Sequence, residues 1–132
     1  ECETVLTPHP GEMARLLGRP VEDPVKDAQA FAAAHRCVVL LKGACTVIAA
    51  PDGRLTFNVI GTSGMATAGS GDALTGIITA LLAQGLSAYD AARAGAYLHA
   101  RAGLRAEKKF GAASMTAWDI SECVRLEGCD ID

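Results

Sequence analysis

The residues with the clearest capacity for chemistry lie in a glycine-rich segment, 61–72, with the sequence Gly-Thr-Ser-Gly-Met-Ala-Thr-Ala-Gly-Ser-Gly-Asp. An apolar stretch typical of a helix follows at once. Glycine lets the backbone approach a phosphate closely, and the first N–H groups of a helix point at such an anion. The segment therefore predicts an anion-binding turn, although glycines also serve ordinary turns. Its spacing matches neither the G-x-x-x-x-G-K-[ST] loop nor the G-x-G-x-x-G fingerprint.

Asp72, the last residue of this segment, is the candidate catalytic base. A carboxylate beside a bound phosphate is electrostatically unfavourable unless it takes part in the reaction. It could accept the proton of a hydroxyl that attacks phosphorus. The alternative is a charge at a helix N-terminus that is stabilised only by the helix dipole. The residues alone leave both roles open.

Alternating strand and helix patterns surround this segment and predict an α/β fold with a mostly parallel sheet. Strands are predicted over 5–7, 37–41, 46–50 and 55–59, and helices over 12–17, 24–35, 72–83, 87–108 and 116–126. Asp23, Ser87 and Thr116 are predicted N-caps. Residues 1–132 are predicted to form a single α/β domain.

Three of these elements carry further expectations. The apolar, β-branched strand at 37–41 is typical of a parallel strand that is buried on both faces. The turn at 51–53 predicts a hairpin between the two strands beside it. The helix at 72–83 is apolar on nearly every side, which predicts that it is buried all round.

Composition excludes several classes of protein. Half of the residues are hydrophobic and 20% are charged, which excludes a disordered chain or a coiled coil. The net charge of −3 and the lack of a basic stripe argue against nucleic acid as a partner. The apolar runs are too short to span a membrane. The five cysteines include no C-x-x-C pair. They are interpreted as reduced thiols of a cytoplasmic protein, and no metal-ligating residues are assigned.

Three motifs, in this order and spacing, resemble one family. They are Thr7-Pro8-His9-Pro10-Gly11-Glu12-Met13, Leu41-Lys42-Gly43-Ala44-Cys45-Thr46, and the stretch from Met65 to Gly76 that contains Gly69-Ser70-Gly71-Asp72. Together they look like the ADP/ATP-dependent NAD(P)H-hydrate dehydratases. The last motif alone resembles the anion hole of the wider ribokinase-like superfamily. The resemblance covers about residues 4–120. It implies a ribokinase-like three-layer sandwich of which this chain is the C-terminal half.

The resemblance also implies roles for individual residues. Asp72 would act as the catalytic base and contact the substrate. His9 would contact the hydrated cofactor, and Glu12 would support its loop. Gly69, Ser70 and Gly71 would form the anion hole for the transferred phosphoryl group. The nucleotide would be bound by Gly71 and by the loop residues Lys42, Gly43, Ala44, Cys45 and Thr46, through the backbone and the Thr46 hydroxyl more than through the lysine charge.

The implied reaction repairs hydrated NADH or NADPH. ADP or ATP would phosphorylate the ring hydroxyl, and loss of phosphate would restore the reduced cofactor. Mg²⁺ is the implied metal, because phosphoryl transfer needs charge neutralisation. The implied partners are therefore hydrated NADH or NADPH, the nucleotide and, in some relatives, an NAD(P)H-hydrate epimerase domain.

Two alternative functions remain open. A small-molecule kinase of the same superfamily, acting on a vitamin precursor or a sugar, would use the same turn and Asp72, whereas the motif at 7–12 favours the dehydratase. The second alternative is a non-catalytic truncated fragment, because the first part of the family's sheet has no counterpart here. The apolar elements at 37–41 and 72–83 both need covering elements. We therefore also expect either a longer polypeptide or a homo-oligomer.

Three residues outside these motifs receive structural interpretations. His35 is predicted to be a solvated cation at a helix end. His99 is predicted to be a partly buried helix residue with one hydrogen bond. Trp118 is predicted to pack in the first turn of its helix.

Overall fold

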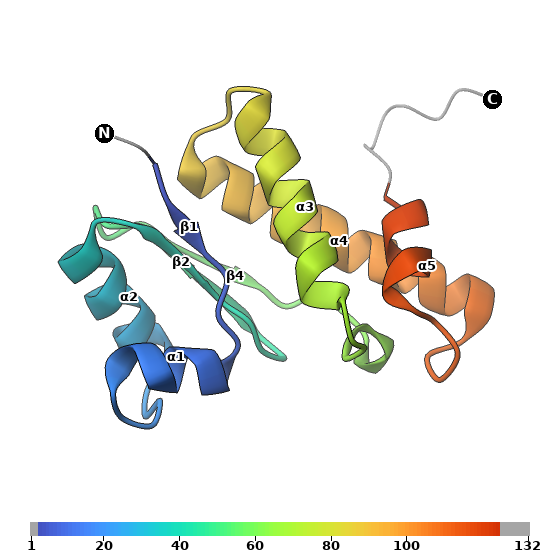
Figure 1. Ribbon diagram of the computed structural model, residues 1–132, viewed down its shortest axis with the longest axis horizontal. Helices are drawn as coiled ribbons and strands as arrows, with labels where there is room; N and C mark the ends of the chain where they lie inside the picture. Colours follow the sequence, from blue (N-terminus) through green and yellow to red (C-terminus); the bar gives the residue numbers. More distant parts are fainter. Residues whose placement is uncertain (1–2, 125–132) are drawn as a thin grey trace.

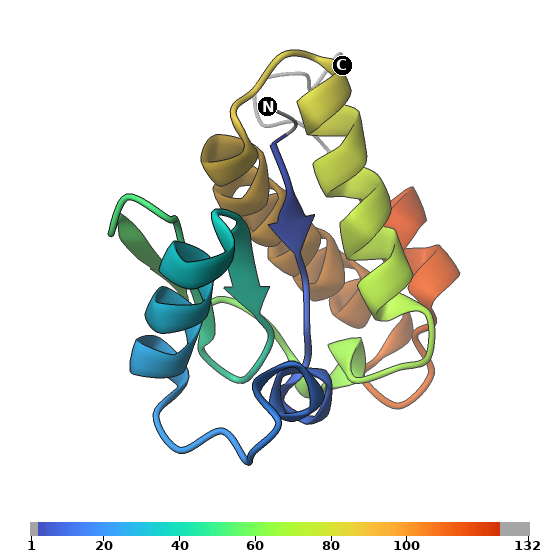
Figure 2. The ribbon, with the colours of Figure 1, turned by 60° about the vertical axis from the view of Figure 1, so that its left-hand side comes forward.

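The computed structural model of the chain describes residues 3–124. Its elements, in chain order, are β1 (Val5–Leu6), α1 (Pro10–Leu17), α2 (Pro24–His35), β2 (Val38–Leu41), β3 (Thr46–Ala49), β4 (Leu55–Asn58), the 3-10 turn η1 (Ser63–Met65), α3 (Ser70–Ala83), α4 (Ala88–Phe110) and α5 (Ala117–Glu122). The four strands form one sheet in the order β1-β2-β3-β4. Helices α1 and α2 lie on one side of this sheet and α3 and α4 on the other, which makes three layers (Figures 1 and 2).

The sheet is mixed, which corrects the expectation of a mostly parallel sheet. β1 pairs with β2 in parallel, with Val5 opposite Val38. The pairings of β2 with β3 and of β3 with β4 are antiparallel. Connection length explains the difference: α1 and α2 carry the chain back between β1 and β2, whereas 42–45 and 50–54 are too short for a crossover. The hairpin predicted around 51–53 is confirmed.

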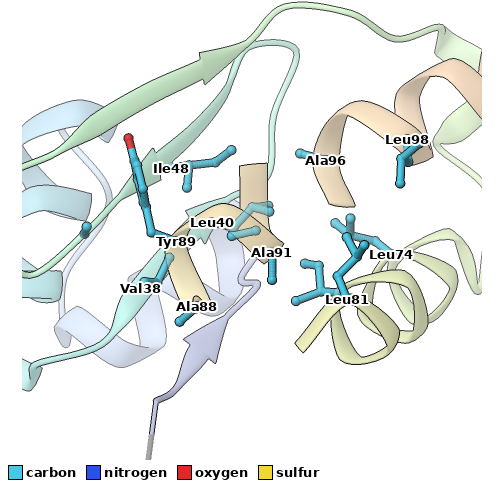
Figure 3. Close-up of a cluster of buried hydrophobic side chains, with 13 residues drawn as sticks. Val38, Leu40, Ile48, Leu74, Leu81, Ala88, Tyr89, Ala91, Ala96 and Leu98 are labelled. Atoms are coloured by element: carbon cyan, nitrogen blue, oxygen red, sulfur yellow. The ribbon is translucent and has the colours of Figure 1, made fainter. Parts of the chain in front are cut away.

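Two hydrophobic cores lie on opposite faces of β2, because its side chains alternate. Val38 and Leu40 point towards α3 and α4 and pack in a cluster with side chains of those helices (Figure 3). Val39 and Leu41 point the other way and pack with Met13 and other side chains of α1 and α2. All four residues of β2 are buried, so the prediction of a strand covered on both faces is confirmed.

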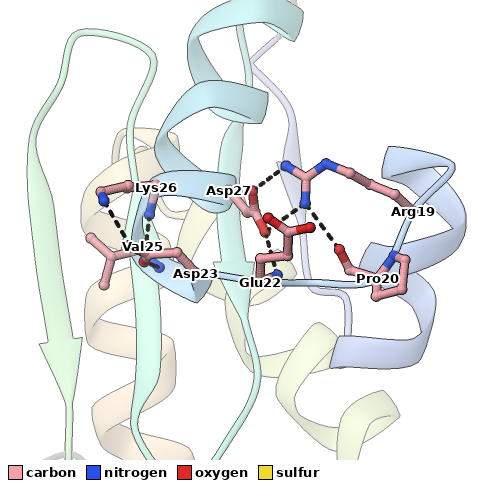
Figure 4. Close-up of polar contacts among 7 residues, drawn as sticks. All are labelled: Arg19, Pro20, Glu22, Asp23, Val25, Lys26 and Asp27. Carbon is pink, nitrogen blue, oxygen red and sulfur yellow. Dashed lines mark hydrogen bonds and ion pairs between the residues drawn. The ribbon is translucent and has the colours of Figure 1, made fainter.

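The connection between α1 and α2 is held by the buried carboxylate of Asp27, which is 5% exposed. It accepts hydrogen bonds from the Arg19 guanidinium at 3.2 Å and from the Glu22 amide at 3.0 Å (Figure 4). The hydrogen bond from Arg19 holds the pKa of Asp27 below its usual value. α2 begins where the sequence predicted, because the Asp23 carboxylate accepts two amides of its first turn.

α3 packs along α4 at points where α4 has no side chain. A Cβ atom on Gly95 would lie 2.6 Å from Ile78 Cγ1, and one on Gly103 would lie 2.4 Å from Met65 Sδ. Ile78 belongs to α3 and Met65 to η1. Close approach at these two glycines therefore fixes both α3 and the glycine-rich segment on α4.

α3 buries one face rather than its whole circumference, which corrects the expectation for 72–83. Leu74, Ile78 and Leu81 are buried. Thr75 and Thr79 are exposed, and each hydroxyl donates a hydrogen bond to the carbonyl one turn earlier. The exposed side of α3 therefore carries these two threonines, opposite the apolar face that packs in the core.

The ends of the last helices differ from the predicted bounds. α4 continues to Phe110, slightly beyond the predicted end near Lys108. α5 ends at Glu122, and the predicted end at 126 lies outside the described residues. Trp118 is 79% exposed, which corrects the prediction that it packs, because α5 buries only Ile120. Within residues 3–124, none of the helices combines the length and the hydrophobicity needed to cross a membrane.

Candidate active site

α3 begins at the glycine turn without a side-chain cap. Its N-cap, Gly69, has a φ of 85°, in the left-handed region that favours glycine. The Ser70 amide donates to the Thr67 carbonyl at 3.2 Å. The amides of Gly71 and Asp72, in contrast, donate to no other described residue. These two N–H groups are at the positive end of the helix dipole, so they are available to an anion.

Lys42 brings a positive charge to the same turn from the end of β2. Its Nζ atom lies 3.1 Å from the position that a Cβ atom on Gly71 would take. It also lies 3.8 Å from Glu12 Oε2. The Lys42 amide donates to the Pro8 carbonyl at 2.8 Å, which ties the end of β2 to the loop before α1. The structure therefore brings together residues from all three motifs that the sequence analysis identified.

The rest of the 42–46 loop is a tight connection between β2 and β3. Gly43, Ala44 and Cys45 are exposed. The Thr46 hydroxyl donates to the Gly43 carbonyl at 3.4 Å, a long hydrogen bond that closes the loop. Gly43, Ala44 and Thr46 line a large cavity together with Lys42, whereas Cys45 is outside its lining.

His9 and Glu12 form a capping box at the start of α1, which the sequence analysis did not predict. His9 Nδ1 accepts from the amides of Gly11 and Glu12 at 3.1 and 3.2 Å, and Glu12 Oε2 accepts from the His9 amide at 2.8 Å. That last hydrogen bond lowers the pKa of Glu12, and the Lys42 charge adds to the effect. Because Nδ1 is an acceptor, neutral His9 carries its proton on Nε2.

Two cavities meet at Lys42 and Gly71. The larger, of about 820 Å³, extends from His9 and the 42–46 loop along 58–67 to α4. The smaller, of about 530 Å³, is bordered by α1 and contains Asp72. Lys42 and Gly71 line both cavities. Asp72 is exposed, and its carboxylate has no hydrogen bond or ion pair among the described residues. Groups bound in the two cavities would therefore meet at Lys42 and Gly71.

His99 of α4 is a cavity residue to which the sequence analysis gave no role at this site. Its side chain is buried, with 8% exposed, and its Nε2 atom lies 3.2 Å from Ser70 Oγ. The single hydrogen bond that was predicted is confirmed, although the residue is buried more deeply than expected. Burial lowers the pKa of His99 most, a contact with the Ser70 backbone raises it, and the Lys42 charge lowers it. The net pKa is below its usual value, so the ring is neutral at neutral pH. No sequence signal marked this pair, because packing of α3 on α4 creates it.

Residues 3–124 contain no group of three or more His, Cys, Asp or Glu side chains that could hold a metal ion. Glu12 and Asp72 are the carboxylates beside the smaller cavity. One or two carboxylates suit Mg²⁺ when phosphate oxygens complete its coordination. The site therefore fits an ion that arrives with a bound phosphate group rather than a resident metal centre.

Comparison with known proteins gives consistent findings. A family model described as NAD(P)H-hydrate dehydratase matches residues 1–125. The bifunctional NAD(P)H-hydrate repair enzyme Nnr of Moorella thermoacetica is 54% identical over 120 residues, which is 88% of this chain and 23% of that protein. The ADP/ATP-dependent NAD(P)H-hydrate dehydratase from Bacillus subtilis, co-crystallized with ATP/Mg²⁺, is 34% identical with a TM-score of 0.87, covering 92% of this chain and 46% of that one.

A ribokinase-like superfamily protein from Enterococcus faecalis matches with a TM-score of 0.74 at 30% identity, covering 91% of this chain and 42% of that one. The ribokinase-like α/β fold is therefore confirmed. The chain spans less than half the length of each of these three relatives.

Proposed function

The chain belongs to the NAD(P)H-hydrate dehydratase family, and we propose that it carries the phosphoryl-transfer site of an ADP/ATP-dependent NAD(P)H-hydrate dehydratase. One observation supports this most directly: the free amides of Gly71 and Asp72 and the Lys42 ammonium converge at the start of α3. Backbone donors, the helix dipole and a cation all favour negative charge at that point. A transferred phosphoryl group has the charge and the size that this arrangement suits.

The nucleotide donor is assigned to the larger cavity. A volume of about 820 Å³ is in the range of small-molecule sites, and the cavity walls include the 42–46 loop and Gly71. The terminal phosphate would lie at Gly71, beside Lys42 Nζ. We therefore assign the Lys42 charge a larger part in phosphate binding than the sequence suggested.

The hydrated nicotinamide is assigned to the side of the smaller cavity, where Asp72 lies. The ring hydroxyl oxygen would attack the terminal phosphorus while the bond from phosphorus to the bridging oxygen breaks, so that ADP leaves as AMP or ATP leaves as ADP. The hydroxyl proton would pass to the Asp72 carboxylate. The ring C–O bond would then break with its electron pair on phosphate, and loss of a proton from the neighbouring ring carbon would restore the dihydropyridine.

His9 and Glu12 would hold the loop that separates the two cavities. His9 Nε2 lies 3.4 Å from Glu12 Oε1, and His9 lines the larger cavity, which meets the smaller one at Lys42 and Gly71. We assign to Nε2–H the contact with the part of the hydrated cofactor that reaches this junction. Glu12 would keep His9 and Lys42 in place, because its carboxylate contacts both.

Mg²⁺ is part of the proposal as an ion carried by the nucleotide, where it neutralises phosphate charge. The proposal also includes a cytoplasmic location, supported by the free thiols of Cys37, Cys45 and Cys123, which a reducing compartment maintains. An epimerase partner is supported by the bifunctional Moorella relative. Self-association remains a prediction, which light scattering on the purified protein would test.

The experiment that tests this function supplies the purified protein with hydrated NADH, Mg²⁺ and either ADP or ATP. We expect the absorbance of reduced nicotinamide to return together with an equimolar release of inorganic phosphate. A stable phosphorylated product without phosphate release would indicate a small-molecule kinase instead. If neither donor supports any change, the proposed function is wrong.

A further inference from the structure

A buried hydrogen bond joins α4 to the turn that would hold the phosphoryl group. Ser70 is 6% exposed and His99 is 8% exposed, and His99 Nε2 lies 3.2 Å from Ser70 Oγ. Ser70 is the first residue of α3 and stands between Gly69 and Gly71. The bond therefore ends within the turn itself, at the residue directly before the two free amides.

His99 also lines the larger cavity. Every buried side-chain nitrogen and oxygen in the described part of the chain has a hydrogen-bond partner. The hydrogen bond of His99 uses Nε2, and the residue lines the larger cavity. The second ring nitrogen, Nδ1, is therefore not both sealed from solvent and unpaired.

Ser70 needs a hydrogen-bond partner for its hydroxyl because it is the first residue of a helix. Serine side chains readily accept hydrogen bonds from nearby backbone N–H groups, above all at the start of a helix. An unrestrained Ser70 hydroxyl could turn towards the free amides of Gly71 and Asp72 and compete with an anion for them. The hydrogen bond to His99 holds the hydroxyl away from that position.

We propose that His99 is a positioning residue of the phosphoryl-transfer site, which keeps the Ser70 hydroxyl turned inward and the Gly71 and Asp72 amides free for the donor phosphate. This inference depends on the proposed function, because it assigns His99 a part in the same site. Its rigid support comes from α4, a helix of 23 residues that packs against α3. The neutral ring acts through Ser70 and needs no contact with the phosphate.

The test compares His99→Ala, His99→Gln, Ser70→Ala and the His99→Ala/Ser70→Ala double variant. Calorimetry measures the Kd of each for ADP and for adenosine, which lacks the phosphates. His99→Ala should weaken ADP binding about tenfold, which is what one lost hydrogen bond is worth, and leave adenosine binding within about twofold. Gln places an amide near the position of Nε2, so His99→Gln should restore most of the ADP affinity. In the Ser70→Ala background, His99→Ala should cost no more than about twofold, because the two residues act as one unit.

Two further measurements make the outcomes unambiguous. His35→Ala removes an exposed helix histidine outside both cavities and should leave the Kd for ADP unchanged. Thermal melting identifies any variant that fails to fold, and His99→Gln then provides the answer if His99→Ala does not fold. Equal losses of ADP and adenosine binding, or additive losses in the double variant, would overturn the positioning role and leave the proposed function intact. If the unmodified protein does not bind ADP, the proposed function is wrong and this inference is wrong with it.

Discussion

Two helices, α1 and α3, begin near Lys42 with matched sequences. They differ in whether side chains cap their first N–H groups. α1 begins His9-Pro-Gly-Glu12 and α3 begins Gly69-Ser-Gly-Asp72, so each has a glycine at its second position and a carboxylate at its third. In α1 the histidine ring caps two amides and the carboxylate folds back to cap the histidine amide. In α3 the N-cap has no side chain, and the exposed carboxylate of Asp72 pairs with no other described residue.

The difference shows how the same local pattern serves stability at one helix and chemistry at the other. α1 satisfies its own N–H groups, so nothing remains there for an anion. α3 leaves two of its N–H groups free and takes its support from α4 instead, through Gly95 and His99. Lys42 lies between the two helices, 3.8 Å from Glu12 Oε2 and beside Gly71.

The largest expected effect distinguishes the carboxylate of Asp72, which should matter for turnover, from that of Glu12, which should matter for stability. Asp72→Asn should lower kcat by about 10² to 10⁴, because it removes the proposed general base, and should leave the Kd for ADP within a few-fold. Glu12→Gln, at the equivalent position of α1, should lower Tm, because it weakens the capping box. Turnover of hydrated NADH, calorimetry with ADP and thermal melting check these results. An Asp72→Asn protein that keeps most of its rate would disprove the assignment of the base.

The next effect distinguishes Gly71, the second residue of α3, from Gly11, the second residue of α1. A Cβ atom on Gly71 would lie 3.1 Å from Lys42 Nζ and enter the space of the anion. Gly71→Val should therefore weaken ADP binding by more than about tenfold. Gly11→Ala at the equivalent position of α1 would press on the His9 ring, with Cε1 at 3.1 Å, and should lower Tm while the Kd for ADP changes only a few-fold. Normal ADP affinity in folded Gly71→Val would mean that the turn binds no phosphate.

A third prediction tests whether packing on α4 replaces the missing cap of α3. In Gly95→Ala the new Cβ would lie 2.6 Å from Ile78 Cγ1, so the Ile78 side chain or α3 itself must shift, at a cost of about 1–3 kcal/mol in unfolding free energy. Gly76→Ala is the matched control in α3, where no atom lies within 4 Å of the new Cβ, and should stabilise the protein by about 0.5–1 kcal/mol. Chemical denaturation measures both. If both variants are equally stable, close packing at Gly95 is not what holds α3.

The sequence was most informative where a local pattern has one physical solution. The N-caps at Asp23 and Thr116, the buried strand β2 and the hairpin were all predicted, because each depends on a few consecutive residues. The glycine segment was recognised as a turn before a helix for the same reason. The mixed sheet was missed because two short connections, rather than the strand patterns, decide strand direction.

The features that were missed at the site depend on contacts between distant residues or on an uncommon cap. The Ser70–His99 bond joins residues 29 positions apart, and only the approach of α3 to α4 at Gly95 brings them together. His9 was expected as a substrate contact, and its use as an N-cap was not anticipated, because the favoured caps are Ser, Thr, Asp and Asn. The His9–Glu12 spacing was the available signal, since the residue three positions after a cap completes a capping box.

The smallest expected effect is a pH dependence of the stability that Glu12 contributes at the start of α1. The pKa of folded Glu12 is below its ordinary value of 4.5, because the carboxylate accepts the His9 amide and lies near Lys42. A carboxylate with a lowered folded pKa stabilises the protein above its unfolded pKa, and this contribution is lost as the pH falls through the folded pKa. The Tm of the unmodified protein should therefore exceed that of Glu12→Gln at neutral pH, and the gap should narrow and close as the pH falls below 4.5 and through the folded pKa. Thermal melting of both proteins across this range measures the gap. A gap that stays constant down to the lowest pH would show that the ionised carboxylate does not stabilise α1, and the contrast between the two helix starts would then depend on the His9 ring alone.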